Sequence, residues 1–142
     1  MGNLKREVIV TVSTIQKEDG EKDSFSNEYK GTLFVKNGKY FIFYTEYGEE
    51  GDKMSDSVIR CDGENVEIKR TGAYSSVLAF SRGKEYKTVY STPYGGMPVS
   101  LKCKNVLCAI DSQGGKLILD YKMNIADKNY ENNVTISVKC TD

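Results

Sequence analysis

Hydrophobic residues recur at every second position over most of this 142-residue chain, and no other feature constrains its fold as strongly. Between residues 116 and 125, Leu117, Leu119, Tyr121 and Met123 alternate with mostly polar neighbours. Other segments with the same period are 8–12, 97–103 and 134–140. Successive side chains of a strand point to opposite faces, so a strand with one buried face has this period. No window offers a convincing helical stripe, and the sequence therefore predicts an all-β chain.

Turn-forming residues separate the predicted strands. Asn37-Gly38 is typical of a type I′ hairpin, and Asp62-Gly63 is a second signal of that kind. Lys104-Asn105 is expected to join two strands, and Ser81-Arg82-Gly83 to form a three-residue hairpin loop. The remaining turn candidates are Gly114-Gly115, the stretch 127–129 and the acidic, glycine-containing segment 47–57, which we interpret as a mobile loop.

The apolar faces agree across two of these predicted turns. A two-residue loop at Asp62-Gly63 sets Cys61 opposite Glu64, with Ile59, Cys61, Val66 and Ile68 on one face. A two-residue loop at Lys104-Asn105 sets Cys103 opposite Val106. It gathers six residues on one face, namely Val99, Leu101, Cys103, Val106, Cys108 and Ile110. A register fixed by a buried face requires such agreement.

About ten such strands, joined by short loops, indicate sequential up-and-down pairing. A sheet of that size curls into two layers or closes, and closure removes the exposed edges. We therefore predict one domain, residues 1–142, folded as a single antiparallel up-and-down β-barrel of about eight to ten strands, like calycins and lipocalins. Such a barrel has room for core side chains or one small ligand.

The charge balance argues against two classes of partner. Lys and Arg number 20, and so do Asp and Glu, so the formal net charge is zero. This gives no electrostatic reason to expect binding to nucleic acid, where phosphate neutralisation dominates affinity, or to an anionic membrane. The sequence has no apolar run long enough for a transmembrane helix and no signal-peptide pattern, so we expect a cytoplasmic protein.

The chain has no histidine, which removes the usual general base and the commonest metal ligand. Ser-His-Asp and Cys-His catalysis are excluded, and we expect a non-enzyme without a cofactor or metal. The four cysteines fall on predicted core positions and are interpreted as buried thiols: Cys61, Cys103, Cys108 and Cys140. The carboxylates of Glu49 and Glu50 are expected to be solvated in their loop.

Arg70 shares a strand face with Val66 and Ile68, so its side chain is predicted to point inward near a strand end. A buried guanidinium needs partners. It could anchor an anionic ligand group at the barrel mouth, or it could be a structural plug. Tyrosines could line a pocket beside it or fill the core. These candidates are Tyr40, Tyr44, Tyr86, Tyr90, Tyr94 and Tyr121, with Tyr94 in a loop that could border the mouth.

The hairpin around Asn37-Gly38 is apolar on both faces. Phe34, Phe41 and Phe43 share the face opposite to Leu33 and its neighbours. Only one face can line the barrel interior, and large uncovered apolar patches are rare on monomers. The phenyl face is therefore expected either to form a homodimer contact or to be covered by the loop 47–57.

The order and spacing of several short motifs resemble the YwiB-like family of small bacterial proteins. These motifs are Ile68-Lys69-Arg70-Thr71-Gly72, Phe80, Tyr90-Ser91-Thr92-Pro93-Tyr94-Gly95, Leu119-Asp120-Tyr121 and Asn132-Asn133-Val134-Thr135-Ile136, with Gly31, Tyr40 and Tyr44 upstream. The resemblance covers nearly the whole chain. It implies a calycin-type barrel and assigns no reaction, since the family has no established function. The cysteines do not belong to the family pattern.

Two main functions remain open at the level of sequence, and a third alternative is a histidine-free enzyme that works through tyrosine and arginine side chains. The barrel could bind a small, partly apolar ligand among Arg70 and the inner tyrosines. Alternatively, its interior could be filled, and the protein would then act through a homodimer or a partner surface around Phe34, Phe41 and Phe43. The two differ in whether the interior holds an open cavity.

Overall fold

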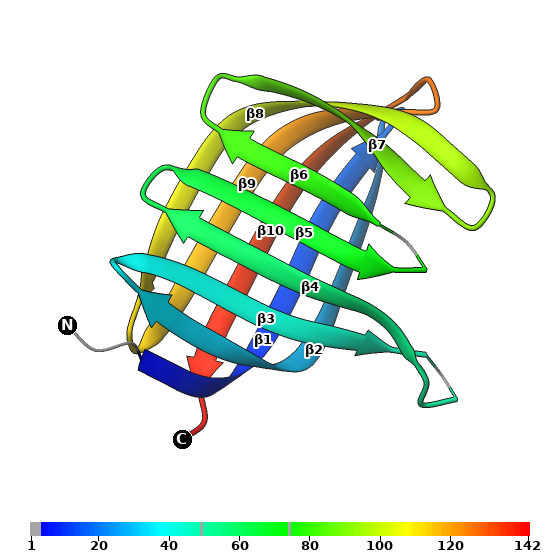
Figure 1. The fold of residues 1–142 in the computed structure, drawn as a ribbon. Helices are drawn as coiled ribbons and strands as arrows, with labels where there is room; N and C mark the ends of the chain where they lie inside the picture. The colour runs from blue at the N-terminus through cyan, green and yellow to red at the C-terminus, as the bar shows by residue number, and fades with distance from the viewer. Residues whose placement is uncertain (1–3, 49, 74) are drawn as a thin grey trace.

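The computed structural model describes residues 4–48, 50–73 and 75–142, and these form a sheet of ten antiparallel strands (Figure 1). The strands are β1 (Leu4–Glu18), β2 (Glu21–Lys36), β3 (Lys39–Tyr47), β4 (Lys53–Asp62), β5 (Asn65–Gly72), β6 (Ser76–Ser81), β7 (Glu85–Thr92), β8 (Gly95–Asp111), β9 (Gly114–Ile125) and β10 (Lys128–Cys140). The described residues include no helix long and apolar enough to span a membrane.

The sheet curls into a nearly closed barrel, which confirms the predicted fold class. Its strand order is β6-β5-β4-β3-β2-β1-β10-β9-β8-β7, so every neighbour except the β1–β10 pair is consecutive in the chain. The two edge strands, β6 and β7, face each other without a ladder. We call this line the seam. An isolated bridge joins Ser75 and Ser91 at one end of the seam, with two N–O distances of 2.9 Å.

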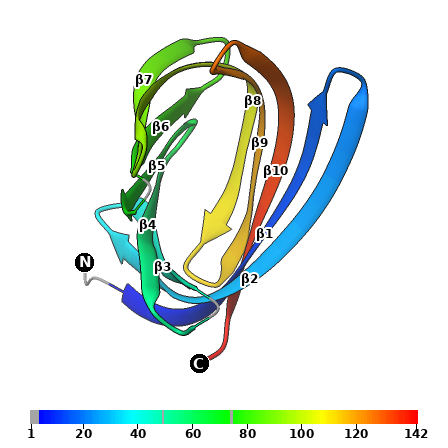
Figure 2. The same ribbon diagram turned by 90° about the vertical axis from the view of Figure 1, so that its right-hand side faces the viewer.

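All odd-numbered strands end, and all even-numbered strands begin, at the same end of the barrel, which we call the mouth. The arrowheads of β3, β5 and β7 point toward it in Figure 1, and Figure 2 views the molecule from that side. The opposite end carries the first residues of β1 and the last residues of β10 (Figure 1). There Thr141 donates its backbone N–H to the carbonyl of Glu7 at 3.0 Å.

The alternating residues of the sequence form the inner wall. Val8 and Val10 of β1, Leu33 of β2, Ile42 of β3 and Ile59 of β4 are buried in one continuous core. Leu117 and Leu119 of β9 and Ile136 of β10 complete it from the other side. The period of two therefore identified the buried face, as expected for strands covered on one side.

The turn at Asn37-Gly38 is confirmed. Lys36 pairs with Lys39, and both turn residues have positive φ (52° and 75°), as a type I′ turn requires. The turn at Asp62-Gly63 is displaced by one residue, because Asp62 pairs with Asn65 and the loop is Gly63-Glu64. Cys61 therefore faces Val66 and not Glu64. The same side chains still point to the inner face, because the partner of Cys61 changes by two positions, from Glu64 to Val66.

The predicted turn at Lys104-Asn105 is wrong. β8 continues through these residues as one strand, and Lys104 is the extra residue of a β-bulge between the pairs Cys103–Tyr121 and Asn105–Asp120. One extra residue reverses the alternation, so both halves of β8 keep their apolar side chains inside. A two-residue hairpin would reverse the alternation in the same way. Cys103 and Cys108 consequently lie along one strand and not across a hairpin.

Other turns also lie at different residues from those predicted. The connection after β6 comprises residues 82–84, and it links two strands that do not form a hairpin ladder. Gly114-Gly115 lies in β9, and the preceding turn is Ser112-Gln113. Asn129 belongs to β10, whose turn is Ala126-Asp127. The predicted loop 47–57 is shorter than expected, because β3 ends at Tyr47 and β4 already begins at Lys53. Glu49 lies outside the described residues.

Candidate functional site

Large side chains fill the middle of the barrel. Phe80 of β6 and Tyr121 of β9 meet edge to face, with ring centroids 4.9 Å apart and an interplanar angle of 64°. Phe80 is almost fully buried and Tyr121 nearly so. Tyr121 is also hydrogen-bonded to the side chain of Asn132, which lies opposite it on β10. The interior below the mouth is therefore packed, and open volume is found at the mouth.

A hollow of about 340 Å³ lies at the mouth, beside the seam. Leu78 of β6 and Tyr90 of β7 line it from the two sides of the seam. The remaining lining residues come from the wall formed by β1, β10, β9 and β8, and they are Gln16, Tyr130, Met123, Ile125 and Val99. None of these described lining residues is charged. The wall is mostly apolar, with one amide and two phenol groups, as in small-molecule sites.

An ion pair occupies the other half of the mouth. Arg70 of β5 contacts Glu46 of β3, with an Nη2–Oε2 distance of 2.5 Å, and donates from Nε to Ser55 Oγ of β4 at 3.2 Å. The two charged side chains are 28% and 23% exposed, so both are largely withdrawn from water. The alternation of residues along β5 correctly predicted that Arg70 lies on the inner wall. The structure adds that a carboxylate of the chain itself already neutralises it.

Two stacked tyrosines flank this ion pair. The rings of Tyr29 and Tyr44 lie 4.8 Å apart with an interplanar angle of 25°. Burial raises the pKa of both phenols, and the nearby carboxylate of Glu46 raises each further. A hydrogen bond with buried Ser57 acts in the opposite direction on the pKa of Tyr44. Both phenols therefore stay neutral at physiological pH.

The predicted ligand-binding residues do not form one site in the structure. Tyr90 lines the hollow, whereas Arg70 and Tyr44 belong to the polar half of the mouth. Tyr40 packs partly buried against the core, Tyr86 is half-buried on β7, and Tyr121 fills the barrel centre. Tyr94 lies outside, 96% exposed, in the turn between β7 and β8.

Sequence reasoning missed Glu46, although a signal was present. Glu46 continues the inward series Tyr40, Ile42 and Tyr44 at the same spacing of two. A carboxylate at that position calls for a partner, and Arg70 supplies it. Gln16 and Tyr130 were also missed, because they lie in strand ends beyond the clearest apolar alternation.

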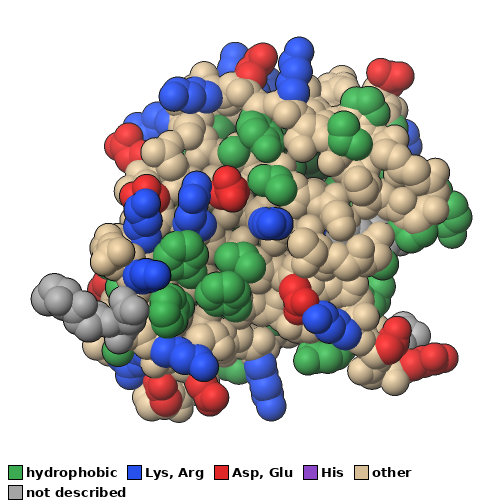
Figure 3. All heavy atoms as spheres, in the orientation of Figure 1, with side chains coloured by type: hydrophobic (Ala, Val, Ile, Leu, Met, Phe, Trp, Pro, Cys, Tyr) green, Lys and Arg blue, Asp and Glu red, His purple; other side chains and the backbone are tan. Residues whose placement is uncertain are grey.

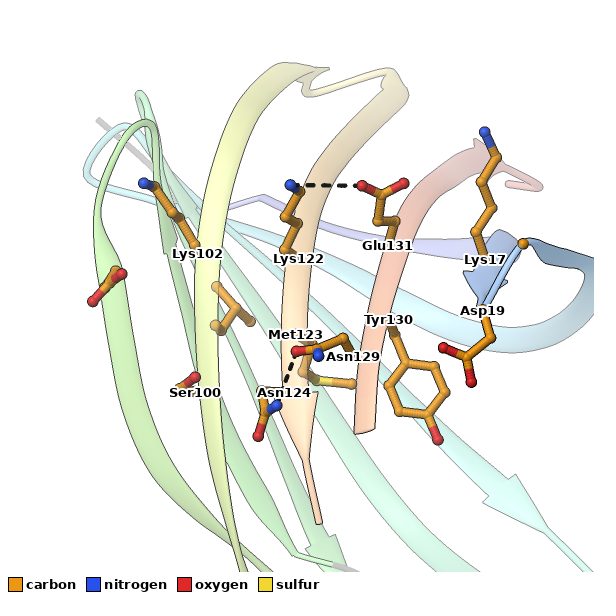
Figure 4. Close-up of a pocket in the computed structure, with 13 residues that line it drawn as sticks. Lys17, Asp19, Ser100, Lys102, Lys122, Met123, Asn124, Asn129, Tyr130 and Glu131 are labelled. Carbon is orange, nitrogen blue, oxygen red and sulfur yellow. Dashed lines mark hydrogen bonds and ion pairs between the residues drawn. The ribbon is translucent and has the colours of Figure 1, made fainter. Parts of the chain in front are cut away.

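A second hollow, of about 500 Å³, adjoins the first on the outer side of the sheet (Figure 4). Met123 and Tyr130 line both. Its other side chains are mostly charged or polar. Lys122 and Glu131 form an ion pair there at 3.7 Å, with both side chains more than half exposed. Asn124 donates to Asn129 at 2.9 Å. Exposed pairs of this kind contribute little to stability or binding, so we interpret the second hollow as a solvated surface feature and not as a ligand site.

The three predicted interface phenylalanines lie on the outer wall. Phe34 and Phe41 face each other across β2 and β3 and are half-buried, while Phe43 is 42% exposed. Phe43 also faces Val58 on β4. Hydrophobic side chains gather over β3 and β4 in Figure 3, surrounded by charged ones. The phenyl patch, comprising Phe34, Phe41, Phe43 and Val58, is thus only partly covered.

The cysteines are free thiols within the barrel wall. Cys61 and Cys103 are buried, and Cys108 and Cys140 are half-buried. A hydrogen bond with the side chain of Cys108, together with burial, raises the pKa of the Cys61 thiol. Among the described residues, no three Cys, Asp or Glu side chains come together as a metal site would require.

Comparisons with known proteins agree with this architecture. A family described as a domain of unknown function, DUF1934, matches residues 10–137. The uncharacterized beta-barrel protein YwiB of Bacillus subtilis (strain 168) is 25% identical over 137 residues, which cover 94% of this chain and 95% of that protein. The crystal structure of the ywiB protein from Bacillus subtilis superposes with a TM-score of 0.87 at 20% identity, covering 97% of this chain and 94% of that one. These similarities support the barrel and assign no ligand.

Proposed function

The chain belongs to the DUF1934 family of unknown function, and we propose that within this family it acts as a binding protein for a small, partly apolar ligand. One observation carries the proposal. A packed barrel keeps a hollow of about 340 Å³ at its mouth, and the residues lining it are mostly apolar with three polar tips. That volume is at the lower end of the range for ligand pockets, roughly 300 to 1,000 Å³.

The lining favours an uncharged ligand. An ionised group loses its hydration when it enters an apolar site and needs a counter-charge there. The described lining residues supply hydrogen bonds from Gln16, Tyr90 and Tyr130 and no charge. A neutral molecule with one or two polar groups would bury its apolar part against Leu78, Val99 and Ile125.

The test is a titration with the neutral fluorophore 1-aminoanthracene. Val99→Trp fills the hollow from the inner face of β8, and its affinity for the probe should fall about tenfold or more. Leu107→Trp makes the same kind of change on the same strand, but at a side chain that is 53% exposed on the outer wall, and should bind like the wild type. Probe binding that is unaffected by Val99→Trp, in a variant with wild-type circular dichroism, would contradict the site.

The natural ligand can be sought directly. Native mass spectrometry of the protein purified from its own host should reveal a bound small molecule, and Val99→Trp purified in parallel should have lost it. A mass equal to that of the bare chain in both preparations counts against retention of a ligand.

A second function, homodimer formation through the phenyl patch, is favoured by the 42% exposure of Phe43 beside Phe41 and Val58. A formal net charge of zero imposes no long-range repulsion between two copies. Sedimentation velocity at high micromolar concentration should then detect a dimer in the wild type and a monomer for Phe43→Lys. A monomeric wild type excludes this function.

A further inference from the structure

We infer that Glu46 determines the charge selectivity of the mouth, because it neutralises Arg70 and so excludes anionic ligands. The inference rests on the proposed ligand site and deepens it by naming the class of ligand that the site rejects. Arg70 brings a positive charge to the inner wall, and Glu46 cancels it from within the chain.

Arg70 lies close enough to the hollow for its charge to matter there. On the inner face, Arg70 of β5 faces Ser76 of β6, and Leu78 is the next inward residue along β6. Leu78 lines the hollow. Diagonal neighbours on one face of an antiparallel pair are roughly 7–8 Å apart, which a long arginine side chain spans. The ion pair and the hollow are therefore adjoining parts of one mouth.

The geometry places Glu46 where a ligand carboxylate would bind. A guanidinium holds a carboxylate best through its paired N–H groups. In this structure Nη2 is directed at Glu46 Oε2, and Nε is directed at Ser55 Oγ, so the chain's own acceptors hold both groups. An anionic ligand would have to displace Glu46 and would then lie beside its negative charge. A neutral ligand meets neither obstacle.

The matched probes are 1-octanol and octanoate, which share an eight-carbon chain and differ in the charge of the head group at pH 7. Isothermal titration calorimetry should show the wild type preferring octanol. In Glu46→Gln the amide keeps the shape of the side chain but not its charge, and Arg70 becomes able to pair with a ligand carboxylate. Octanoate affinity should rise about tenfold, in line with a charge-assisted hydrogen bond.

Two controls separate this effect from general changes in charge. Glu67→Gln removes a carboxylate that pairs with Arg60 at 3.6 Å on the outer wall, and it should not alter octanoate binding. The double variant Glu46→Gln/Arg70→Gln should lose the gain. Unchanged octanoate affinity in folded Glu46→Gln, or an equal gain in Glu67→Gln, overturns the inference about Glu46. Absence of octanol and 1-aminoanthracene binding in the wild type instead contradicts the proposed function, so the two failures are distinguishable.

Discussion

At the scale of single residues, Tyr121 shows how burial in the barrel fixes a protonation state. Its ring packs against Phe80 in the barrel centre, and desolvation raises the pKa of its phenol above the usual value near 10. The hydrogen bond with Asn132 lowers the pKa by a smaller amount. At pH values between the pKa of Tyr121 in the unfolded chain and its pKa in the folded chain, the unfolded chain binds fewer protons than the folded one. The stability that Tyr121 contributes is therefore complete below pH 10 and decreases as the pH rises above it.

We predict that in Tyr121→Phe the free energy of unfolding decreases less steeply with rising pH in the alkaline range than in the wild type. Each tyrosine that ionises only in the unfolded state contributes a slope of up to about 1.4 kcal/mol per pH unit, and the phenylalanine variant lacks one of them. Urea unfolding between pH 8 and pH 11 measures the slope. Tyr94→Phe, at a position that is 96% exposed, should keep the wild-type slope. Equal slopes for wild type and Tyr121→Phe would show that this phenol ionises as easily in the barrel as in water.

At the scale of strands, the bulge at Lys104 keeps β8 in register with the core. Val99, Leu101 and Cys103 point inward before it, and Val106 and Ile110 point inward after it, although their spacing is odd across the bulge. Lys104 itself is exposed. Its presence in the chain matters more than its chemistry, because a strand without the extra residue turns one of these apolar sets toward solvent.

Deletion of Lys104 should therefore be far more damaging than its substitution. We expect the deletion to lower the free energy of unfolding by more than about 4 kcal/mol or to prevent cooperative folding, whereas Lys104→Ala should stay within about 0.5 kcal/mol of the wild type. Urea denaturation followed by circular dichroism measures both. A deletion variant of near wild-type stability would mean that β8 can slide without exposing its apolar side chains.

The same bulge marks the limit of what the sequence could predict. Alternation identified the inner face of nearly every strand, including the position of Arg70. It could not distinguish the bulge from a hairpin at Lys104-Asn105, because both reverse the alternation. The placement of Asp62-Gly63 failed in a related way, since a turn displaced by one residue leaves the same side chains inside. The alternation of residues also shows which side chains point inward but not how much space they leave open or which of them touch. The hollow beside Leu78 and the contact between Glu46 and Arg70 therefore required the three-dimensional structure.

At the scale of the whole molecule, the barrel is held unevenly around its circumference. Ladders join β1 to both β2 and β10 over most of their lengths. Among the described residues, the seam between β6 and β7 has one bridge, at Ser75 and Ser91, and a three-residue connection at its other end. Amides outside a ladder lack the protection that paired strands provide, and regions with few such bonds open locally at low free energy.

Hydrogen exchange should reveal this asymmetry. Peptides covering residues 76–92 are expected to exchange faster than peptides covering 8–14 and 134–139, because each seam strand is paired along one edge only. Mass spectrometry at pH 7 over seconds to hours gives the comparison. If 1-aminoanthracene binds between Leu78 and Tyr90, its addition should slow exchange in the seam selectively. Uniform protection around the barrel would contradict the uneven closure.

The pairing of β1 with β10 also affects how the protein is made. A ribosome delivers β1 first among these strands and β10 last, yet the two are neighbours in the finished sheet. Until residues 128–140 emerge, β1 and β9 each present an open edge that another nascent chain could pair with. Completion of the sheet must therefore wait for the last strand to be translated, and a chain interrupted before β10 would be a template for aggregation.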